Sequence, residues 1–422
     1  MSQSGYFELP LDVPADAIEI ARRLRERPDL ALLLDTSGAT PAYIACDACE
    51  ISNGVDPEPQ LRLDSSSQAE FPRWIGVLPY EVGRGVERGA AVDPRALPHL
   101  VEPEWRRYGA VIEVHSGVRI VGTDRERAEA LKQVVLKSSP VEPSAVCLLG
   151  KGDPEPPGTH LQRIRSALAQ IAAGQIYQVN LARRAVFELE GRAVDVLEKL
   201  LDRTDGPFCA VLALNEIDVM ATSPELFLSL AATGALESIP IKGTRPRGVT
   251  ELYDQQLRAE LASDPKEQAE LAMVVDVVRN DLGRIAATGS VQLAGGFQVE
   301  SFRSVHHRGA RVVAQLSPTA TREQLFLALL PSGSVTGAPK SRAMELIAEL
   351  EADRRGLYTG AFGMIRENGG VRLGMAIRTL TRHRETGETH YFSGGGIVAD
   401  SVPDLEVEET NWKSAHLSAL AG

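Results

Sequence analysis

The sequence predicts an α+β fold in which large antiparallel sheets pack with peripheral helices and an N-terminal lobe completes the structure. Predicted strands arrive in runs that a few long helices interrupt, whereas a βαβ repeat would alternate more regularly. The 422 residues are 43% hydrophobic and 24% charged, which is ordinary for a folded globular protein. A chain of this length is long enough for two or three average domains, or for one large domain with an attached lobe.

Residues 1–140 form the predicted N-terminal lobe. Two helices mix there with short strands, and the polar segment 57–67 is predicted to be a mobile loop. Residues 141–158 are rich in Pro and Gly, which predicts a linker. The predicted elements of this lobe are helices over 16–27 and 124–137 and strands over 30–34, 110–115 and 118–121.

Residues 159–422 form the predicted second domain, in which the signals for regular structure are denser. A helix and a long strand open it, and a helix closes it. The predicted helices cover 159–173, 265–284, 322–330, 338–350 and 404–420. The predicted strands cover 177–190, 209–214, 226–230, 236–241, 290–293, 308–315, 361–366, 371–377 and 391–393.

The charge balance restricts the partners. Against 57 acidic side chains there are 45 basic ones, and the formal net charge is −12. Such a chain is a poor candidate for binding nucleic acid or anionic membranes. If its ligand is an anion, the positive charge must be local and must come from a metal ion or a few placed Arg and Lys side chains.

The composition also predicts a location. The first residues, MSQSGYFELPLDVP, lack the basic stretch and apolar core of a signal peptide, and no run of residues is apolar over the length that spans a bilayer. Four cysteines in this length are typical of reduced thiols, so we expect a cytoplasmic protein. Cys46 and Cys49 form a lone CxxC pattern, which fits two incidental thiols better than the alternative of a zinc or redox site.

Lys242 is the first candidate for chemistry. It projects where a short apolar strand meets a turn, in the run PIKGTRPR over residues 240–247. In a cleft, desolvation or a nearby cation makes such a lysine neutral and nucleophilic. Taken alone, a lysine at this position is more often a solvated strand end.

Two pairs of glutamates are candidates for a metal site. Glu267 and Glu270 lie on one predicted helix and Glu406 and Glu409 on another, and a spacing of three puts each pair on one helix face. Lys413 follows Glu409 by four residues, on the same face. Carboxylates that two helices present to a shared cleft hold a hard cation, and an all-oxygen donor set favours Mg²⁺ over Zn²⁺. Each pair alone is also typical of a solvated helix surface.

Two glycine-rich stretches resemble anion-binding loops. Residues 333–341 do not match a phosphate loop, because the spacing fails GxxxxGK[ST] and Pro339 removes a backbone N–H. The stretch from Ser393 to Gly396 allows N–H groups to approach an anion closely, and it is equally typical of a tight turn. Single candidates, each more often structural than catalytic, are Glu225, His307, Tyr358 and Arg378.

Taken together, these segments resemble the chorismate-utilising enzymes, a family that includes anthranilate synthases, aminodeoxychorismate synthases, isochorismate synthases and salicylate synthases. The matching stretches run in family order over roughly residues 160–420, whereas the first 140 residues resemble the family only loosely. They are YQVNLA (177–182), SPELF (223–227), PIKGTRPR (240–247), DPKEQAEL (264–271), VHHRG (305–309), GSVTGAPK (333–340), GLYTG (356–360), MAIR (375–378) and the segment from GGGIV to EET (394–410).

The residues at two positions distinguish the enzymes of this family by the reaction that they catalyse. The branches that add water carry a lysine base where this chain has Gln178, and a glutamine cannot deprotonate water. Anthranilate synthases carry alanine at the position of Lys242, whereas the branch that aminates C4 of chorismate carries lysine. The resemblance therefore implies a transaminase-class amination at C4, on the route to 4-aminobenzoate and folate. The enzymatic alternative is anthranilate synthesis, and the non-enzymatic alternative is a catalytically silent chorismate-binding subunit.

The resemblance also implies a mechanism. Lys242 would attack C2 as the C4 hydroxyl departs, and ammonia would then attack C4 and expel the lysine. Glu225 matches the family's general acid and needs a raised pKa to keep its proton near pH 7. Lys242 needs the opposite displacement, a depressed pKa.

The remaining roles follow from the same resemblance. Glu270 and Glu409 would ligate Mg²⁺, with Glu267 and Glu406 supporting them. Tyr358, Arg378 and three backbone amides would hold the enolpyruvyl carboxylate, Lys413 would reach the ring carboxylate, and His307 and Ser334 would line the cleft near the C4 oxygen. The implied substrate-binding positions are Gln178, Thr244, His307, Ser334, Tyr358, Arg378, Gly394, Gly395, Gly396 and Lys413.

Partners are implied in the same way. The sequence contains no glutaminase nucleophile motif and no appended lyase domain, so a separate glutamine amidotransferase subunit would supply ammonia and a separate lyase would act on the product. The resemblance leaves open whether residues 33–37 bind tryptophan, as the N-terminal lobe of some relatives does.

Overall fold

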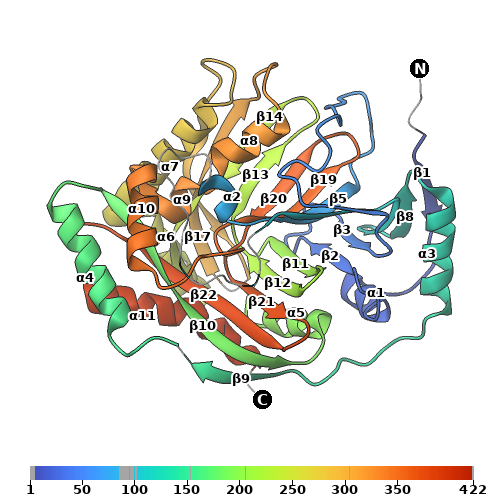
Figure 1. The fold of residues 1–422 in the computed structure, drawn as a ribbon, viewed down its shortest axis with the longest axis horizontal. Coiled ribbons are helices and arrows are strands. Elements are labelled where there is room, and N and C mark those ends of the chain that lie inside the picture. The colour runs from blue at the N-terminus through green and yellow to red at the C-terminus, as the bar shows by residue number, and fades with distance from the viewer. Residues whose placement is uncertain are drawn as a thin grey trace.

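Two large antiparallel sheets form the centre of the molecule, and the predicted α+β fold is confirmed (Figure 1). The computed structural model describes residues 5–84, 95, 99, 102–152, 154–204, 206–303 and 305–420. No helix within these ranges combines the length and the apolar character that a bilayer crossing needs.

The first sheet contains twelve of the described strands, in the order β1-β8-β7-β3-β2-β11-β12-β21-β22-β10-β18, with β9 beside β10. Their bounds are β1 (Phe7–Pro10), β2 (Ala31–Leu34), β3 (Ala42–Ala45), β7 (Ala110–Val114), β8 (Val118–Gly122), β9 (Cys147–Gly152), β10 (Gln178–Glu190), β11 (Phe208–Ala213), β12 (Ile217–Ser223), β18 (Gly337–Ala338), β21 (Thr379–His383) and β22 (Glu388–Ile397).

The second sheet contains ten described strands, in the order β15-β17-β14-β13-β20-β19-β5-β6-β4, with β16 beside β17. Their bounds are β4 (Glu50–Ser52), β5 (Pro72–Leu78), β6 (Glu104–Arg107), β13 (Leu226–Leu230), β14 (Ala235–Ile239), β15 (Ile241–Pro246), β16 (Gln292–Ser301), β17 (Val305–Gln315), β19 (Ala361–Arg366) and β20 (Val371–Met375).

Helices lie around the two sheets. Their bounds are α1 (Ala17–Arg23), α2 (Glu81–Arg84), α3 (Arg125–Lys137), α4 (Thr159–Ala172), α5 (Ala193–Leu201), α6 (Glu251–Ser263), α7 (Pro265–Gly283), α8 (Arg322–Leu329), α9 (Gly333–Thr336), α10 (Lys340–Leu350), α11 (Pro403–Ser414) and the 3₁₀ helix η1 (Ala415–Leu420). Several starts are fixed by capping. The Asp124 and Asp264 side chains accept backbone N–H groups at the starts of α3 and α7, and Pro265 occupies the first turn of α7.

The sheets pack face to face, and the side chains of each strand alternate between two apolar layers. In β11, Leu212 belongs to the cluster between the sheets, whereas Val211 belongs to the cluster under α1, α3 and α5. In β5, Val77 faces the other sheet and Trp74 packs with residues of α7 and α8. Both faces of β5 and β11 are therefore buried, which explains why these two strands are mostly apolar.

Strands from the predicted N-terminal lobe take part in both sheets. β2 pairs with β11 in the first sheet, and β5 pairs with β19 in the second. The predicted linker, residues 141–158, is not free of regular structure, because β9 lies within it and pairs with β10. The boundary near residue 140 therefore does not separate two independent cores.

Two predicted elements are divided in the structure. The strand predicted over 236–241 is broken into β14 and β15 at Pro240, which has no N–H to continue the ladder. The helix predicted over 404–420 is α11 followed by η1. The segment 57–67 contains no regular secondary structure, as expected, but its start is tied down, because the Arg322 guanidinium contacts the Asp56 carboxylate and the Glu58 carbonyl.

Arg355 ties together the elements behind the candidate site. Its side chain is fully buried and pairs with Glu351, with Nη2 2.6 Å from Oε1. It also donates to the carbonyls of Asn180 in β10, at 2.7 Å, and of Val335 in α9, at 2.8 Å. One guanidinium thus joins β10, α9 and the end of α10.

We predict that Arg355→Ala lowers the free energy of unfolding by about 3–5 kcal/mol, because it leaves the buried Glu351 carboxylate and two carbonyls without their partner. Urea denaturation checks this value. The control is Arg342→Ala, which removes a partly exposed pair on α10 and is expected to cost less than about 1 kcal/mol. Equal losses in the two variants would contradict the structural role of Arg355.

Candidate functional site

Lys242 lies at the start of β15 and reaches toward β22. A Cβ built on Gly396 of β22 would lie 3.1 Å from Lys242 Nζ and 2.8 Å from Gln178 Nε2. A larger residue at 396 would displace one of these groups. The glycine therefore allows the lysine and the glutamine to meet over the backbone of β22.

The surroundings of Lys242 favour its neutral form. The residue as a whole is partly exposed, yet burial around its ammonium is the largest cause that lowers its pKa. The charge of Lys413 lowers the pKa further, whereas Glu270, Glu409 and Glu225 act in the opposite direction. Because the pKa is lowered overall, a larger share of Lys242 is uncharged than of a solvated lysine.

The pKa of Glu225 is shifted in the opposite direction from that of Lys242. It follows β12, is 5% exposed, and accepts a hydrogen bond from Ser334 Oγ of α9 at 2.8 Å. Burial raises the pKa of Glu225 to about 7, although the Ser334 hydrogen bond and the charge of Lys242 act against this. The carboxyl group therefore holds its proton near neutral pH.

Gln178 presents a buried amide. The residue is 1% exposed, and neither Nε2 nor Oε1 has a hydrogen-bond partner among the described residues. An amide left in this state costs about 1–3 kcal/mol. Water or a ligand bound beside Lys242 would satisfy it.

Thr244, two residues after Lys242 in β15, forms a pair with His307 of β17. Thr244 Oγ1 and His307 Nδ1 are 2.9 Å apart, and His307 is almost fully buried. Burial, with the charge of Arg378, lowers the pKa of His307 to about 3, so the imidazole is neutral. Its Nε2 has no hydrogen-bond partner in the described part of the chain.

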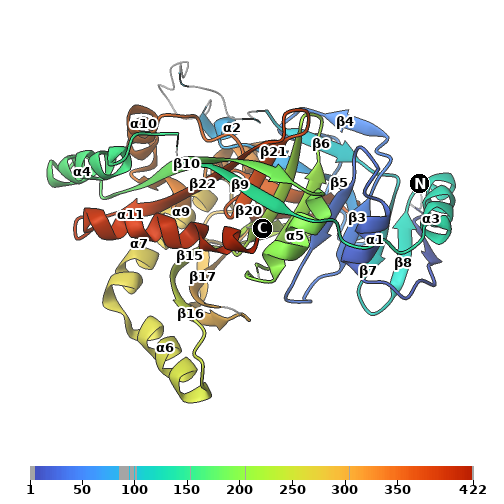
Figure 2. The same ribbon diagram turned by 90° about the horizontal axis from the view of Figure 1, so that it is seen from below.

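The four predicted glutamates come from α7 and α11, which lie on the same side of the molecule (Figure 2). Burial is the largest cause that raises the pKa of Glu270 and of Glu406, and Glu406 Oε2 is buried without a hydrogen-bond partner among the described residues. A Cβ on Gly395 would lie 3.4 Å from Glu406 Oε2 and 3.6 Å from Glu409 Oε1. Within the described ranges, however, no three of the four carboxylates bring oxygen atoms within 4.8 Å of one another.

The donor chemistry of this set fits a hard cation. All four groups offer oxygen, and the raised pKa values of Glu270 and Glu406 show that nearby positive charges do not offset their burial, which a divalent ion would do. Glu267 also has a cationic neighbour, since its Oε1 lies 3.3 Å from Arg245 Nη1. The residues present therefore fit Mg²⁺ in their chemistry.

Lys413 joins α11 to β22. Its Nζ lies 2.6 Å from Glu409 Oε1 and donates to the Gly394 carbonyl at 2.7 Å. Burial of Glu409 acts to raise its pKa, but the ion pair with Lys413 outweighs this and the pKa is lowered. The carbonyl of Gly394 is therefore occupied by the lysine.

The residues expected to hold a carboxylate are less closely grouped. Arg378 adopts a positive φ of 49°, and its Nη1 lies 3.4 Å from Thr204 Oγ1. Tyr358 stacks on Phe392 at 5.2 Å between ring centroids and lies near the Arg355 guanidinium. Tyr358 is thus packed against Phe392 and Arg355.

Sequence reasoning missed His416, in η1. Burial and the charge of Arg378 lower its pKa to about 3, and its Nε2 has no hydrogen-bond partner within the described ranges. The ring meets Tyr391 edge-on at 5.5 Å. A lone histidine near the end of a helix provides no signal by which the sequence alone could single it out.

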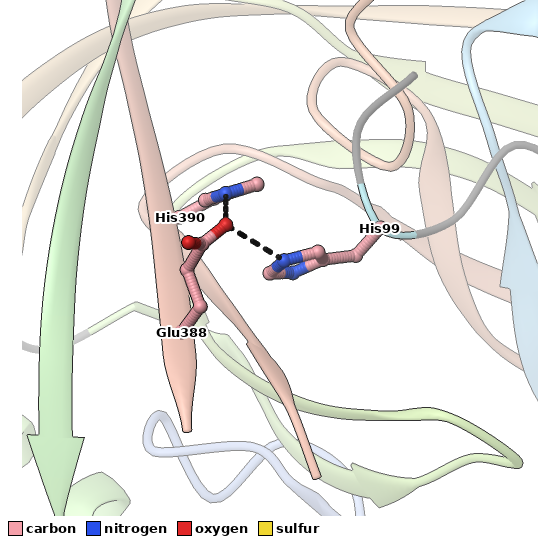
Figure 3. A group of neighbouring side chains, drawn as sticks. All are labelled: His99, Glu388 and His390. Atoms are coloured by element: carbon pink, nitrogen blue, oxygen red, sulfur yellow. Dashed lines mark hydrogen bonds and ion pairs between the residues drawn. The ribbon is translucent and has the colours of Figure 1, made fainter. Parts of the chain in front are cut away.

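A second cluster, His99, Glu388 and His390, was also missed (Figure 3). Glu388 Oε1 lies 2.9 Å from His390 Nε2 and 3.6 Å from His99 Nε2, and the two rings stack at 3.7 Å. Although two imidazoles and a carboxylate resemble a metal-binding set, Arg184 Nη1 lies 3.2 Å from the same His390 Nε2. A guanidinium at this ligand atom disfavours a cation, and we assign no metal here.

Comparison with known proteins shows which proteins this chain is similar to. The model of a family described as chorismate binding enzyme matches residues 36–419. The aminodeoxychorismate synthase component 1 of Salmonella typhimurium is 39% identical over 249 residues, which are 59% of this chain and 54% of that protein. The anthranilate synthase component 1 1 of Haloarcula marismortui is 38% identical over 248 residues, which are 59% of this chain and 50% of that protein. The chain thus spans about half the length of these curated relatives.

Solved structures resemble the whole fold. Anthranilate synthase component I from Streptococcus pneumoniae TIGR4 has a TM-score of 0.74 at 24% identity and covers 100% of this chain and 93% of its own. The menaquinone-specific isochorismate synthase MenF from Escherichia coli has a TM-score of 0.79 at 18% identity, with coverages of 99% and 94%. At these identities the likeness supports the fold.

We predict that Glu225 makes stability depend on pH. The folded protein holds the Glu225 proton up to about pH 7, whereas an unperturbed glutamate releases it near 4.5. Relative to Glu225→Gln, the wild type therefore loses stability as pH rises from 4.5 to 7, by up to about 3 kcal/mol, and the difference is constant outside this window. Urea denaturation of both proteins across this range measures it. A difference that does not change with pH would show that Glu225 titrates normally.

Proposed function

The chain belongs to the chorismate binding enzymes, and on that premise we propose that it aminates chorismate at C4 to form 4-amino-4-deoxychorismate, as component I of an aminodeoxychorismate synthase. The observation that carries this proposal is the pair of opposite pKa displacements at Lys242 and Glu225. Burial shifts Lys242 toward the uncharged amine and Glu225 toward the protonated carboxyl group, and each charge acts on the pKa of the other residue.

The proposed steps use the uncharged amine of Lys242 and the protonated carboxyl group of Glu225. Lys242 Nζ attacks C2 of the ring as the C4–O bond breaks, the ring double bond shifts, and Glu225 protonates the departing hydroxyl, which leaves as water. Ammonia then attacks C4, the double bond returns, and the C2–Nζ bond breaks, which restores Lys242. A proton lost from the ammonia nitrogen balances the one that Glu225 gave up.

Gln178 supports amination over hydration. A general base is needed to activate water, and an amide side chain does not accept a proton at neutral pH. Its unsatisfied amide instead offers a donor and an acceptor to the substrate beside Lys242. Anthranilate synthesis is the second candidate, because relatives of that name match the chain at similar identity.

The positively charged and neutral donors are proposed to hold the two substrate carboxylates. Arg378, Tyr358 and the N–H groups of residues 394–396 would hold the enolpyruvyl carboxylate, and Lys413 the ring carboxylate. His307 and Thr244 would lie near the C4 oxygen, with the neutral imidazole available through its free Nε2.

Mg²⁺ is proposed as the cofactor, held by Glu270 and Glu409 with Glu267 and Glu406 in support. When bound, it would supply positive charge for a substrate carboxylate that the acidic chain otherwise repels. A glutamine amidotransferase subunit is the proposed source of ammonia, in line with the word component in the names of the relatives.

One assay separates the candidates. Purified protein with chorismate, Mg²⁺ and ammonium, followed by an aminodeoxychorismate lyase, is expected to yield 4-aminobenzoate, measured by chromatography. Anthranilate that forms without the lyase would overturn the assignment in favour of anthranilate synthesis.

We predict that Lys242→Ala reduces C4 amination at least 100-fold, because no nucleophile remains for the first displacement. Lys137→Ala, which removes an exposed lysine at the end of α3, is the matched control and is expected to leave the rate unchanged. Steady-state rates with saturating ammonium measure both variants. Undiminished turnover by Lys242→Ala would eliminate the covalent role.

We predict that EDTA abolishes turnover and that Mg²⁺ restores it. Glu409→Gln is expected to raise the half-saturating Mg²⁺ concentration at least tenfold, because it removes one charged oxygen ligand. The neighbouring Glu408 is exposed on the same helix, so Glu408→Gln should leave the Mg²⁺ dependence unchanged. Identical Mg²⁺ titrations for the two variants would rule out a metal at this site.

A further inference from the structure

A cavity of about 150 Å³ lies away from the site described above, between the end of α1, the start of α5 and strands β11, β12 and β21. In Figure 2, α7 and α11 lie at the left and α1 at the right, with α5 between them. None of the lining residues belongs to the candidate functional site. Five arginines line the cavity: Arg25, Arg27, Arg192, Arg382 and Arg384.

Two of these arginines share one carboxylate. Arg382 Nη2 lies 2.6 Å from Asp218 Oδ2, and Arg384 Nε lies 3.0 Å from Asp218 Oδ1. Backbone carbonyls fix both guanidinium groups, since Arg382 Nη1 donates to Gly191 O at 2.6 Å and Arg384 Nη1 donates to Pro28 O at 2.8 Å. These two charges are therefore held in place before any ligand arrives.

Two further arginines of the cavity also share a single carboxylate. Glu26 Oε1 lies 3.3 Å from Arg25 Nε and 3.2 Å from Arg192 Nη2, and the Glu26 side chain is 75% exposed. Arg27 pairs with Asp47 at 3.1 Å. Five guanidinium groups thus share three carboxylates among the residues that the structure describes. Two positive charges remain in surplus, in a chain whose net charge is −12.

The start of α5 adds backbone donors to the arginines. Ala193 and Val194 line the cavity, and Arg192 at the cap position makes no side-chain capping hydrogen bond. The first N–H groups of a helix have no partner within the helix and favour an anion. The start of α5 therefore lies at the wall of the cavity that the arginines also line.

We propose that this cavity binds one phosphate group, either as inorganic phosphate or as the phosphoryl end of a small metabolite. A phosphate group carries a charge of about −1.5 to −2, which matches the surplus of two. Guanidinium groups bind phosphate oxygens through paired N–H donors. A volume of 150 Å³, about that of five waters, admits a tetrahedral anion and a few further atoms but not a folded peptide segment.

The test measures phosphate binding by calorimetry and by thermal shift, with sodium chloride at matched ionic strength as the reference. We expect a saturable rise in the melting temperature of the wild type with phosphate. Arg25→Gln/Arg192→Gln, which removes the pair that shares Glu26, is expected to weaken phosphate binding at least tenfold. Arg119→Gln is the matched control, because this β8 side chain is 46% exposed, pairs with Glu8 of β1 and Glu113 of β7, and does not line the cavity. It should change the affinity less than twofold.

Two results would overturn the proposal: no saturable phosphate effect beyond that of chloride, or wild-type phosphate affinity in the double variant, which would mean that phosphate binds elsewhere. If the double variant does not fold, Arg192→Gln alone decides the same question, since that side chain is 44% exposed. The same titration with glycerol 3-phosphate then distinguishes a phosphorylated metabolite from inorganic phosphate as the ligand. Tighter binding indicates a metabolite, and equal or weaker binding indicates inorganic phosphate. Because no readout involves chorismate, failure here leaves the proposed amination untouched.

Discussion

Burial of two ionisable side chains, Lys242 and Glu225, is the constraint on which the rest of the site depends. Loss of hydration disfavours the charged form of each, so the pKa of the lysine falls and that of the glutamate rises to about 7. Their mutual attraction opposes both shifts, but burial is the larger cause in each case. Burial thus increases the share of uncharged Lys242 and of protonated Glu225, the forms that would attack and donate a proton in the proposed mechanism.

The fold enforces this arrangement through backbone rather than through side chains alone. The long pairing of β10 with β22 sets Asn180 opposite Gly396, and the missing side chain at Gly396 leaves the room that Lys242 and Gln178 occupy. Arg355 connects β10 to α9, whose Ser334 holds the Glu225 carboxyl group. Positioning of the acid therefore depends on the buried Arg355–Glu351 ion pair, whose guanidinium also lies over the Tyr358 ring.

Local features of this fold were predictable from the sequence, and non-local ones were not. The start of α7 at Pro265 was predicted correctly because capping and helix-face spacing are local, and the same spacing placed Glu267 and Glu270 together. The pairing of β9 with β10, or of β5 with β19, joins segments far apart in the chain, which no local pattern encodes. The arginine-lined cavity could not have been predicted for the same reason, because its residues come from the two ends and the middle of the sequence. The roles of Lys242 and Glu225 were predictable only by resemblance, since burial of a single lysine leaves no trace in composition.

The direct test of this account is the pKa of Lys242 in the folded protein. Competitive labelling with a small amine-reactive reagent, followed by peptide mass spectrometry, gives the reactivity of Lys242 against pH, with exposed Lys137 as the internal reference. The account predicts a titration midpoint below 10.5, the ordinary value for a lysine. A midpoint at or above 10.5 would mean that the amine is charged at neutral pH, and it would contradict the central claim.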